Sequence, residues 1–127
     1  MPLSLKFLLV ASLYGVFGML LGIIMGAQEN FMLMPVHAHL NLLGWIAIML
    51  YGLTYQAIPK LSASRLAVWH FYVVNAGILL LIPSLALLLL GNRAVLPLLM
   101  LGELFSMASL LMFMANLWQN GRKLGAA

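Results

Sequence analysis

FLLVASLYGVFGMLLGIIMGA, residues 7–27, is a run of about 21 residues that contains no charged side chain. A helix needs about 20 predominantly apolar residues to cross the hydrocarbon core of a bilayer, so this run predicts a membrane span. Lys6 precedes the run, as a basic residue would in a signal peptide. However, the run is longer than the roughly 7–15 residues of a signal-peptide core, and no small-x-small cleavage site follows, so we expect a retained helix.

The rest of the chain has the same apolar character. Of its 127 residues, 65% are hydrophobic and 6% are charged, and the mean hydropathy is +1.13. This composition is typical of a membrane protein. We predict an all-α membrane protein made of one domain, residues 1–127, with four spans at about 7–27, 36–58, 66–90 and 95–118. Short connections between the spans favour an up-down four-helix bundle.

Basic residues predict the orientation of this bundle. Five of them fall in three segments that four spans place on one side of the membrane: Lys6, Lys60, Arg65, Arg122 and Lys123. Arg93 is the one basic residue on the other side. Because Lys and Arg are enriched in cytoplasmic segments, we expect both termini in the cytoplasm. The placement of the basic residues therefore predicts topology and does not favour a nucleic acid partner. We expect an integral protein of the bacterial inner (cytoplasmic) membrane, in contact with the lipid bilayer.

Small residues recur along the first span at intervals of three and four. They are Ala11, Gly15, Gly18, Gly22 and Gly26. These intervals place the small residues on one face of a helix. Helices in lipid associate through close packing, which small residues allow. We therefore expect this face to pack against a neighbouring helix.

Polar groups inside the spans are costly, so their positions are informative. Glu103 falls about eight residues into the fourth span. It is expected to face the bundle interior or a cavity, either hydrogen-bonded or close to a proton path or a cofactor. Asn41, Asn75 and Gln56 are expected to form hydrogen bonds between helices.

Two of the three histidines open the second span in PVHAHLNLLGW, residues 35–45. On a helix, residues two apart point about 200° away from each other. His37 and His39 therefore cannot hold one metal ion from a regular helix, and each is expected to face a different neighbour. A head-to-tail contact of this kind closes into a cyclic oligomer.

The third histidine is expected to be separate from the pair. His70 on the third span lies level with about Thr54, which is roughly 22 Å below His39 at 1.5 Å per residue. We expect His70 to be a packed or interfacial side chain beside Trp69 and Tyr72.

Two other interpretations of the pair remain open. Met32 and Met34 precede it, and thioether with imidazole suits Cu(I), so the four side chains could bind copper if the first turn is irregular. The histidines could also be polar residues at the membrane interface.

The second span also resembles a known protein family. The residues that carry the resemblance are His39-Leu40-Asn41-Leu42-Leu43, Trp45, Gly52, Tyr55 and Pro59. They are similar to the second helix of the catalytic subunit of nitric oxide reductase, a member of the heme–copper oxidase superfamily, subunit I. Three more segments resemble other helices of that family. Val36-His37-Ala38-His39 is similar to the family's tenth helix. Its third helix is matched by Trp69-His70-Phe71 with Asn75 and Gly77, and its fourth by Leu117-Trp118.

This resemblance implies heme and a trimer. The family fold is a ring of three four-helix units, and its low-spin heme is held by histidines of the second and tenth helices. A single four-helix unit is therefore expected to form a homotrimer, favoured over a dimer, with one heme b between His37 and His39 of neighbouring chains. The chain has no counterpart of the histidines that bind the family's active-site copper, so reduction of oxygen or nitric oxide by the family mechanism is not implied.

These observations predict a membrane b-type cytochrome that transfers electrons. The heme would be noncovalent because the chain has no cysteine, and ligation by two histidines leaves no open iron position. Asn41, Trp45 and Phe31 are expected near the macrocycle. Arg93 is the expected partner of the heme propionates. No motif identifies the electron donor or acceptor.

Two alternative functions stay open. In the first, one histidine holds a five-coordinate heme that binds or reduces oxygen or nitric oxide, with Glu103 and Tyr51 as candidates for proton supply. In the second, the chain handles heme or copper during oxidase assembly and uses the histidine pair as a transient site.

Overall fold

The computed structural model describes residues 1–121 and contains, within them, helices and short connections but no strand. Four helical segments in this part of the chain are long and apolar enough to cross a membrane: Leu3–Gln28, Met34–Ala57, Arg65–Leu89 and Arg93–Gly121. They overlap the four predicted spans, so the helical class and the four candidate spans are confirmed and indicate an integral membrane protein. Arg122 and Lys123 of the predicted inner basic group lie outside the described residues.

The second span is not one regular helix. It begins with α2 (Met34–His39), continues as a π-helix, η1 (Leu40–Ala47), and ends with α3 (Ile48–Ala57). π-Helical segments are rare and occur frequently at functional sites. The remaining elements are α1 (Leu3–Gln28), α4 (Pro59–Ser62), α5 (Arg65–Leu89), the 3₁₀ turn η2 (Arg93–Val95), α6 (Leu96–Asn116) and the π-helical η3 (Leu117–Gly121).

Proline and a serine cap determine where several helices begin. Pro35, Pro59 and Pro97 stand in the first turn of α2, α4 and α6. Proline is suited to this position because its fixed φ is helical and the missing N–H has no intrahelical partner there. At the start of α5, the Ser64 hydroxyl accepts a hydrogen bond from the Ala67 backbone N–H at 3.1 Å, which is the usual N-cap arrangement.

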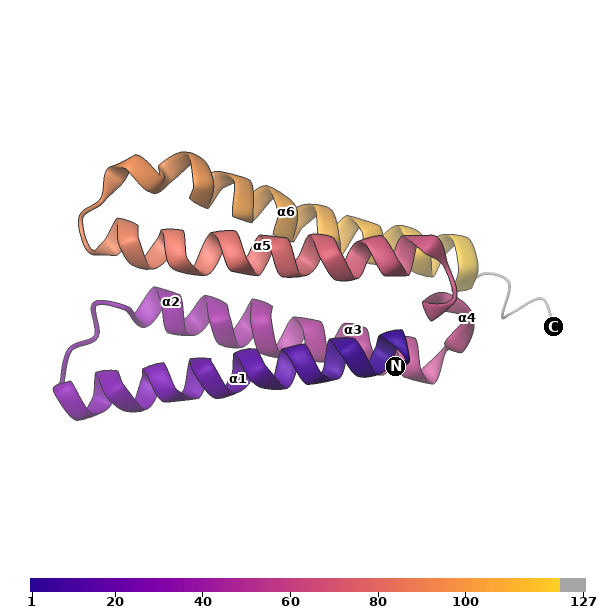
Figure 1. Ribbon diagram of the computed structural model, residues 1–127, viewed down its shortest axis with the longest axis horizontal. Coiled ribbons are helices and arrows are strands. Elements are labelled where there is room, and N and C mark those ends of the chain that lie inside the picture. Colours follow the sequence, from indigo (N-terminus) through magenta and orange to yellow (C-terminus); the bar gives the residue numbers. More distant parts are fainter. Residues whose placement is uncertain (122–127) are drawn as a thin grey trace.

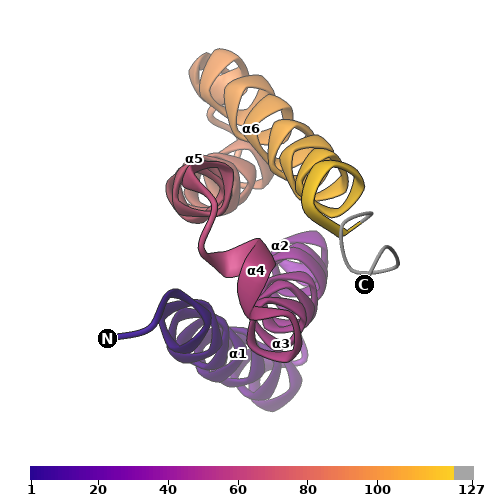
Figure 2. The ribbon, with the colours of Figure 1, turned by 90° about the vertical axis from the view of Figure 1, so that its right-hand side faces the viewer.

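The spans associate as two pairs. α1 packs along α3 and η1, while α5 packs along α6, and the pairs meet where α5 touches α2 and η1. Figure 1 shows the N-terminus and α4 at one end of the molecule and the α1–α2 connection at the other. The view along the bundle in Figure 2 shows α6 next to α5 and on the side away from α1. Most of the exposed side chains on the four spans are large and apolar, as lipid contact requires.

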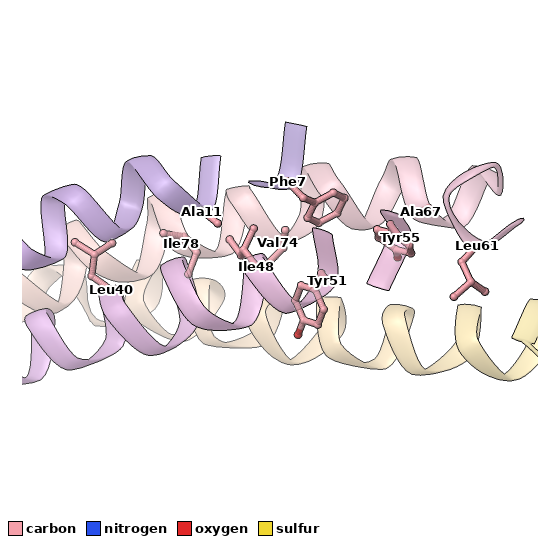
Figure 3. Packing of buried hydrophobic residues seen from close by; sticks show 10 residues of the cluster. All are labelled: Phe7, Ala11, Leu40, Ile48, Tyr51, Tyr55, Leu61, Ala67, Val74 and Ile78. Atoms are coloured by element: carbon pink, nitrogen blue, oxygen red, sulfur yellow. The ribbon is translucent and has the colours of Figure 1, made fainter. Parts of the chain in front are cut away.

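The buried core lies between the two pairs and is richest in aromatic side chains toward the α4 end (Figure 3). Phe7 and Tyr55 pack edge to face with ring centroids 5.2 Å apart. Tyr51 meets Phe113 of α6 at 4.6 Å, so the second and fourth spans touch here. The core cluster is completed by Ala11, Leu40, Ile48, Leu61, Ala67, Val74 and Ile78.

The small residues of α1 form a packing face against the second span, as predicted. A Cβ atom added at three of the glycines would overlap a side chain of that span. The closest approaches are Gly15 to Trp45 at 2.9 Å, Gly18 to Asn41 at 2.6 Å and Gly22 to His37 at 2.7 Å. Gly26 has nothing within 4 Å of such an atom, so the close contact ends before it.

A buried polar cluster ties α4 to the end of α6. The Asn116 side chain is fully buried, and its amide N–H donates to the carbonyl of Leu61 at 3.1 Å. Its amide oxygen accepts from Ser64 at 3.1 Å and from Asn120 at 2.7 Å. One side chain therefore satisfies groups on the short connection and on the last turn of the fourth span.

Replacing Asn116 by alanine is expected to lower the free energy of unfolding by about 1–3 kcal/mol, because it leaves buried hydrogen-bonding groups without partners. Unfolding titrations in detergent micelles measure this loss. Gln119→Ala is the matched control, because Gln119 lies on the same segment with an exposed side chain. Equal stability of the two variants would contradict the assigned role.

Candidate functional site

His37 and His39 point to different parts of the molecule, as the helix geometry requires. His37 faces α1, where its ring lies over Gly22. His39 lines a groove whose other wall is α6. Both histidines lie in the last turn of α2, directly before the π-helix.

The His37 ring is fixed by a backbone carbonyl of another helix. Its Nδ1 lies 2.8 Å from the carbonyl oxygen of Gly18, which can only accept a hydrogen bond. Nδ1 must therefore carry the proton. The Asn41 amide lies farther from Nδ1, at 3.3 Å, and donates instead to the backbone oxygen of His37 at 2.9 Å. The proton on Nδ1 leaves Nε2 with a free lone pair.

His39 has the same protonation for the same reason. Its Nδ1 lies 2.7 Å from the carbonyl oxygen of Pro35, so Nδ1 donates and Nε2 is left as the acceptor. Among the residues that the structure describes, His70 Nε2 is the one buried side-chain nitrogen or oxygen without a hydrogen bond. His37 and His39 are both partly exposed, and within the described residues neither Nε2 has a hydrogen-bond partner.

The groove beside His39 is mostly apolar but carries several polar groups. Its volume is about 350 Å³, and it lies between the second span and α6, with Leu81 of α5 contributing to the wall. The polar side chains on it are His39, Tyr51, Glu103 and Ser106. The contact between Tyr51 and Phe113 lies at the end of the groove nearer α4. The groove thus places an imidazole, a phenol and a carboxyl group on one surface.

Glu103 lies on the exposed side of α6 within the groove. Over the described part of the chain, it has no hydrogen-bond or ion-pair partner. An ionisable side chain at this depth of a span normally faces a protein interior or a polar cavity. The structure places Glu103 on an open, mostly apolar groove at the surface and not in the interior of the single chain, and its role stays a prediction.

The other predicted site residues are not gathered around one point. Trp45 packs on Gly15 of α1, and Asn41 lies flat on Gly18, so both belong to the His37 side. Further residues lie elsewhere: Phe31 is exposed in the α1–α2 connection, and Arg93 is exposed at the start of η2.

The copper interpretation required four side chains to converge. Met32 and Met34 are both exposed near the α1–α2 connection. The two histidines face opposite sides of α2, so all four side chains do not converge around one ion. Within residues 1–121, no group of three or more histidine, cysteine or acidic side chains could hold a metal ion.

His70 is packed, as predicted, but among different neighbours. It is fully buried and Nδ1 lies 2.8 Å from the Tyr55 hydroxyl. The rings of Phe7, Tyr51 and Phe113 surround it within 5.8 Å. The expected neighbours Trp69 and Tyr72 are instead largely exposed. The contact with Tyr55 agrees with the predicted level, and His70 does not reach the histidine pair.

Hydrogen bonds between spans were predicted correctly for only one of three residues. Tyr14 of α1 donates to the Asn75 side-chain oxygen at 3.0 Å. Asn41 instead bonds to its own helix, and Gln56 is exposed. Sequence reasoning missed Asn116 and Ser106. It also missed the carbonyls that orient the histidines, because a backbone acceptor leaves no residue signature.

Comparisons of the chain with protein-family models, with curated proteins and with solved structures gave no match.

Proposed function

We propose that this protein is a membrane b-type cytochrome in which heme iron is held by His37 of one chain and His39 of the next. The observation that supports it most is the matched protonation of the two rings. Each Nδ1 donates to a backbone carbonyl, and this leaves each Nε2 as the ring nitrogen that could bind a metal. Histidines that bind metals almost always donate their other ring N–H to a carbonyl, a carboxylate or water, which fixes the tautomer and the ring orientation.

The residues present fit a bis-histidine heme. His37 and His39, each with a proton on Nδ1, could hold the iron through Nε2, and the groove at His39 offers apolar walls. When bound, the heme would supply reversible one-electron transfer. The part of the chain would be to hold the iron through His37 and His39.

The proposal also includes the assembly. Because the two rings face opposite sides of α2, one chain cannot place both on one iron. A ring of copies in which each His37 side meets the next His39 side makes every site complete. Three copies are favoured over two by the resemblance to a family built from three four-helix units.

The proposed orientation follows the basic residues. Lys6, Lys60 and Arg65 belong to the N-terminus and the α4 region, which lie at one end of the molecule, and Arg93 belongs to the turn before α6. Lys and Arg are enriched in cytoplasmic segments. The proposed topology is therefore an up-down bundle with both termini in the cytoplasm of a bacterium. His37 and His39 would then lie toward the outer side of the membrane.

An absorption spectrum of the detergent-purified protein tests this function. We expect a Soret band with sharp α and β bands on reduction, unchanged by carbon monoxide, because no iron position is open. Absence of a Soret band would exclude the heme proposal, and bound copper in its place would favour metal handling.

One observation favours a second candidate function. His39, Tyr51 and Glu103 share a groove, so a heme held by His39 alone would have an open iron face near two groups able to exchange protons. This five-coordinate heme would bind oxygen or nitric oxide. A carbon monoxide shift of the reduced Soret band would support it over the bis-histidine proposal.

A further inference from the structure

We infer that Gly18 and Gly22 of α1 are positioning residues for His37, setting which ring nitrogen is offered to iron and in which direction. The inference depends on the proposed role of His37 as an iron ligand. It assigns to the first span a part in the site, although that span contributes no ligand of its own.

Gly22 leaves the space that the His37 ring occupies. A Cβ atom built there would lie 2.7 Å from Cε1 of His37 and 3.1 Å from Nδ1. Non-bonded Cβ atoms essentially never approach other heavy atoms closer than 3.0 Å. The ring therefore occupies volume that any residue other than glycine would fill. A side chain at position 22 must move the ring or push α1 away from α2.

The carbonyl of Gly18 lies one helical turn before Gly22. It accepts the Nδ1–H of His37 at 2.8 Å. The ring is consequently held by a hydrogen bond at one turn of α1 and by close contact at the next. Rotation about the side-chain bonds of His37 would break the first or create a clash at the second.

Asn41 lies one helical turn after His37 on the second span. A Cβ atom at Gly18 would lie 2.6 Å from the Asn41 side-chain oxygen, so this amide also depends on a glycine. Asn41 in turn donates to the backbone oxygen of His37 at 2.9 Å. Asn41 therefore supports the backbone that carries the ligand. The expected place of Asn41 near the macrocycle remains a prediction.

These contacts together explain why the first span has glycines at these positions. With Nδ1 bound to Gly18, only Nε2 remains for a metal. Without that bond the ring could present either nitrogen and turn between orientations. Loss of a group that orients a metal-binding histidine typically weakens metal binding by about 10- to 100-fold.

The first experiment titrates hemin into the heme-free protein in detergent and follows the Soret band. Gly22→Ala is expected to raise the dissociation constant by about 10- to 100-fold and to reduce the low-spin fraction. Gly52→Ala is the packing control, because its Cβ would lie 2.9 Å from Leu8 between the same two spans, far from His37. Gly26→Ala is the control for a methyl group added on α1 without any contact, because a Cβ there would meet nothing within 4 Å. Both controls are expected to bind hemin as the unmodified protein does.

Unchanged hemin binding by Gly22→Ala, or an equal loss in Gly52→Ala, would overturn the inference while leaving the heme proposal intact. If the unmodified protein gives no low-spin spectrum, the heme proposal itself fails. Thermal unfolding followed by circular dichroism shows whether Gly22→Ala and Gly52→Ala lose comparable stability, which separates positioning from general packing.

A second measurement requires no heme. Nuclear magnetic resonance of protein labelled at the histidine ring nitrogens distinguishes a proton on Nδ1 from one on Nε2. We expect His37 to carry its proton on Nδ1 in the unmodified protein and in Gly52→Ala, and to show a mixture in Gly22→Ala. A proton on Nε2 of His37 in the unmodified protein would overturn the inference.

Discussion

Replacing either His37 or His39 by alanine is expected to remove the low-spin heme spectrum completely, because each proposed site takes one axial nitrogen from each of two chains. The measurement is heme bound per folded chain, from the absorption spectrum of the purified protein. His70→Ala is the control. Its ring is enclosed by aromatic side chains and bonded to Tyr55, so the spectrum of the folded fraction should be unchanged.

Coexpression of the two alanine variants gives a sharper version of this test. A chain with His37→Ala retains His39, and a chain with His39→Ala retains His37. Where the retained His37 of one variant faces the retained His39 of the other, the interface has both ligands. In a head-to-tail ring mixed at random, about a quarter of the interfaces are complete, and a corresponding part of the spectrum should return. No recovery, or a spectrum that depends on only one of the histidines, would contradict a shared site.

Gly102→Ala is expected to produce the largest loss of stability among the glycine substitutions. A Cβ atom at Gly102 of α6 would lie 2.6 Å from the backbone nitrogen of Leu81 and 2.8 Å from its Cα. These are main-chain atoms of α5, so no side-chain rotation relieves the overlap, and the two helices must separate. Inserting a methyl group into a tight contact typically costs about 1–3 kcal/mol, occasionally more.

Unfolding titrations in detergent micelles measure the effect of Gly102→Ala. Gly26→Ala is the matched control, because the new methyl group meets nothing within 4 Å and alanine favours the helix by up to about 1 kcal/mol. The two variants should therefore change stability in opposite directions. Similar stability of both would show that α5 and α6 do not approach each other as closely as Gly102 indicates.

Much of the architecture was predictable from sequence because lipid imposes simple constraints. Uninterrupted apolar runs predicted four membrane-long helices, and glycine spacing predicted which face of the first span packs closely. The opposite directions of His37 and His39 followed from helix geometry. The π-helix that follows them had no clear signal, since Leu40–Ala47 has the composition of an ordinary apolar helix.

The parts of the site that sequence did not predict depend on contacts between helices. The space over Gly15 places Trp45 against α1, a contact that the sequence did not predict. His70 was expected beside its sequence neighbours, yet those side chains point outward while His70 points into the aromatic core. The packing partner, and not the local sequence, determines the direction in which these side chains point. The grouping of His39 with Glu103 likewise requires knowing that α6 lies across from the second span.

The contact of Tyr51 with Phe113 lies in the α4 half of the bundle, which aromatic side chains fill. Tyr55 and His70 pack beside this contact, and Phe7 packs in turn on Tyr55 and His70. His39, by contrast, lies only five residues from the start of α2 at Met34, about 7.5 Å along the helix axis. In the proposed orientation, a charge at His39 would therefore lie nearer the water at the α1–α2 end than the water at the α4 end. Electron exchange there would involve only a small part of the voltage across the membrane.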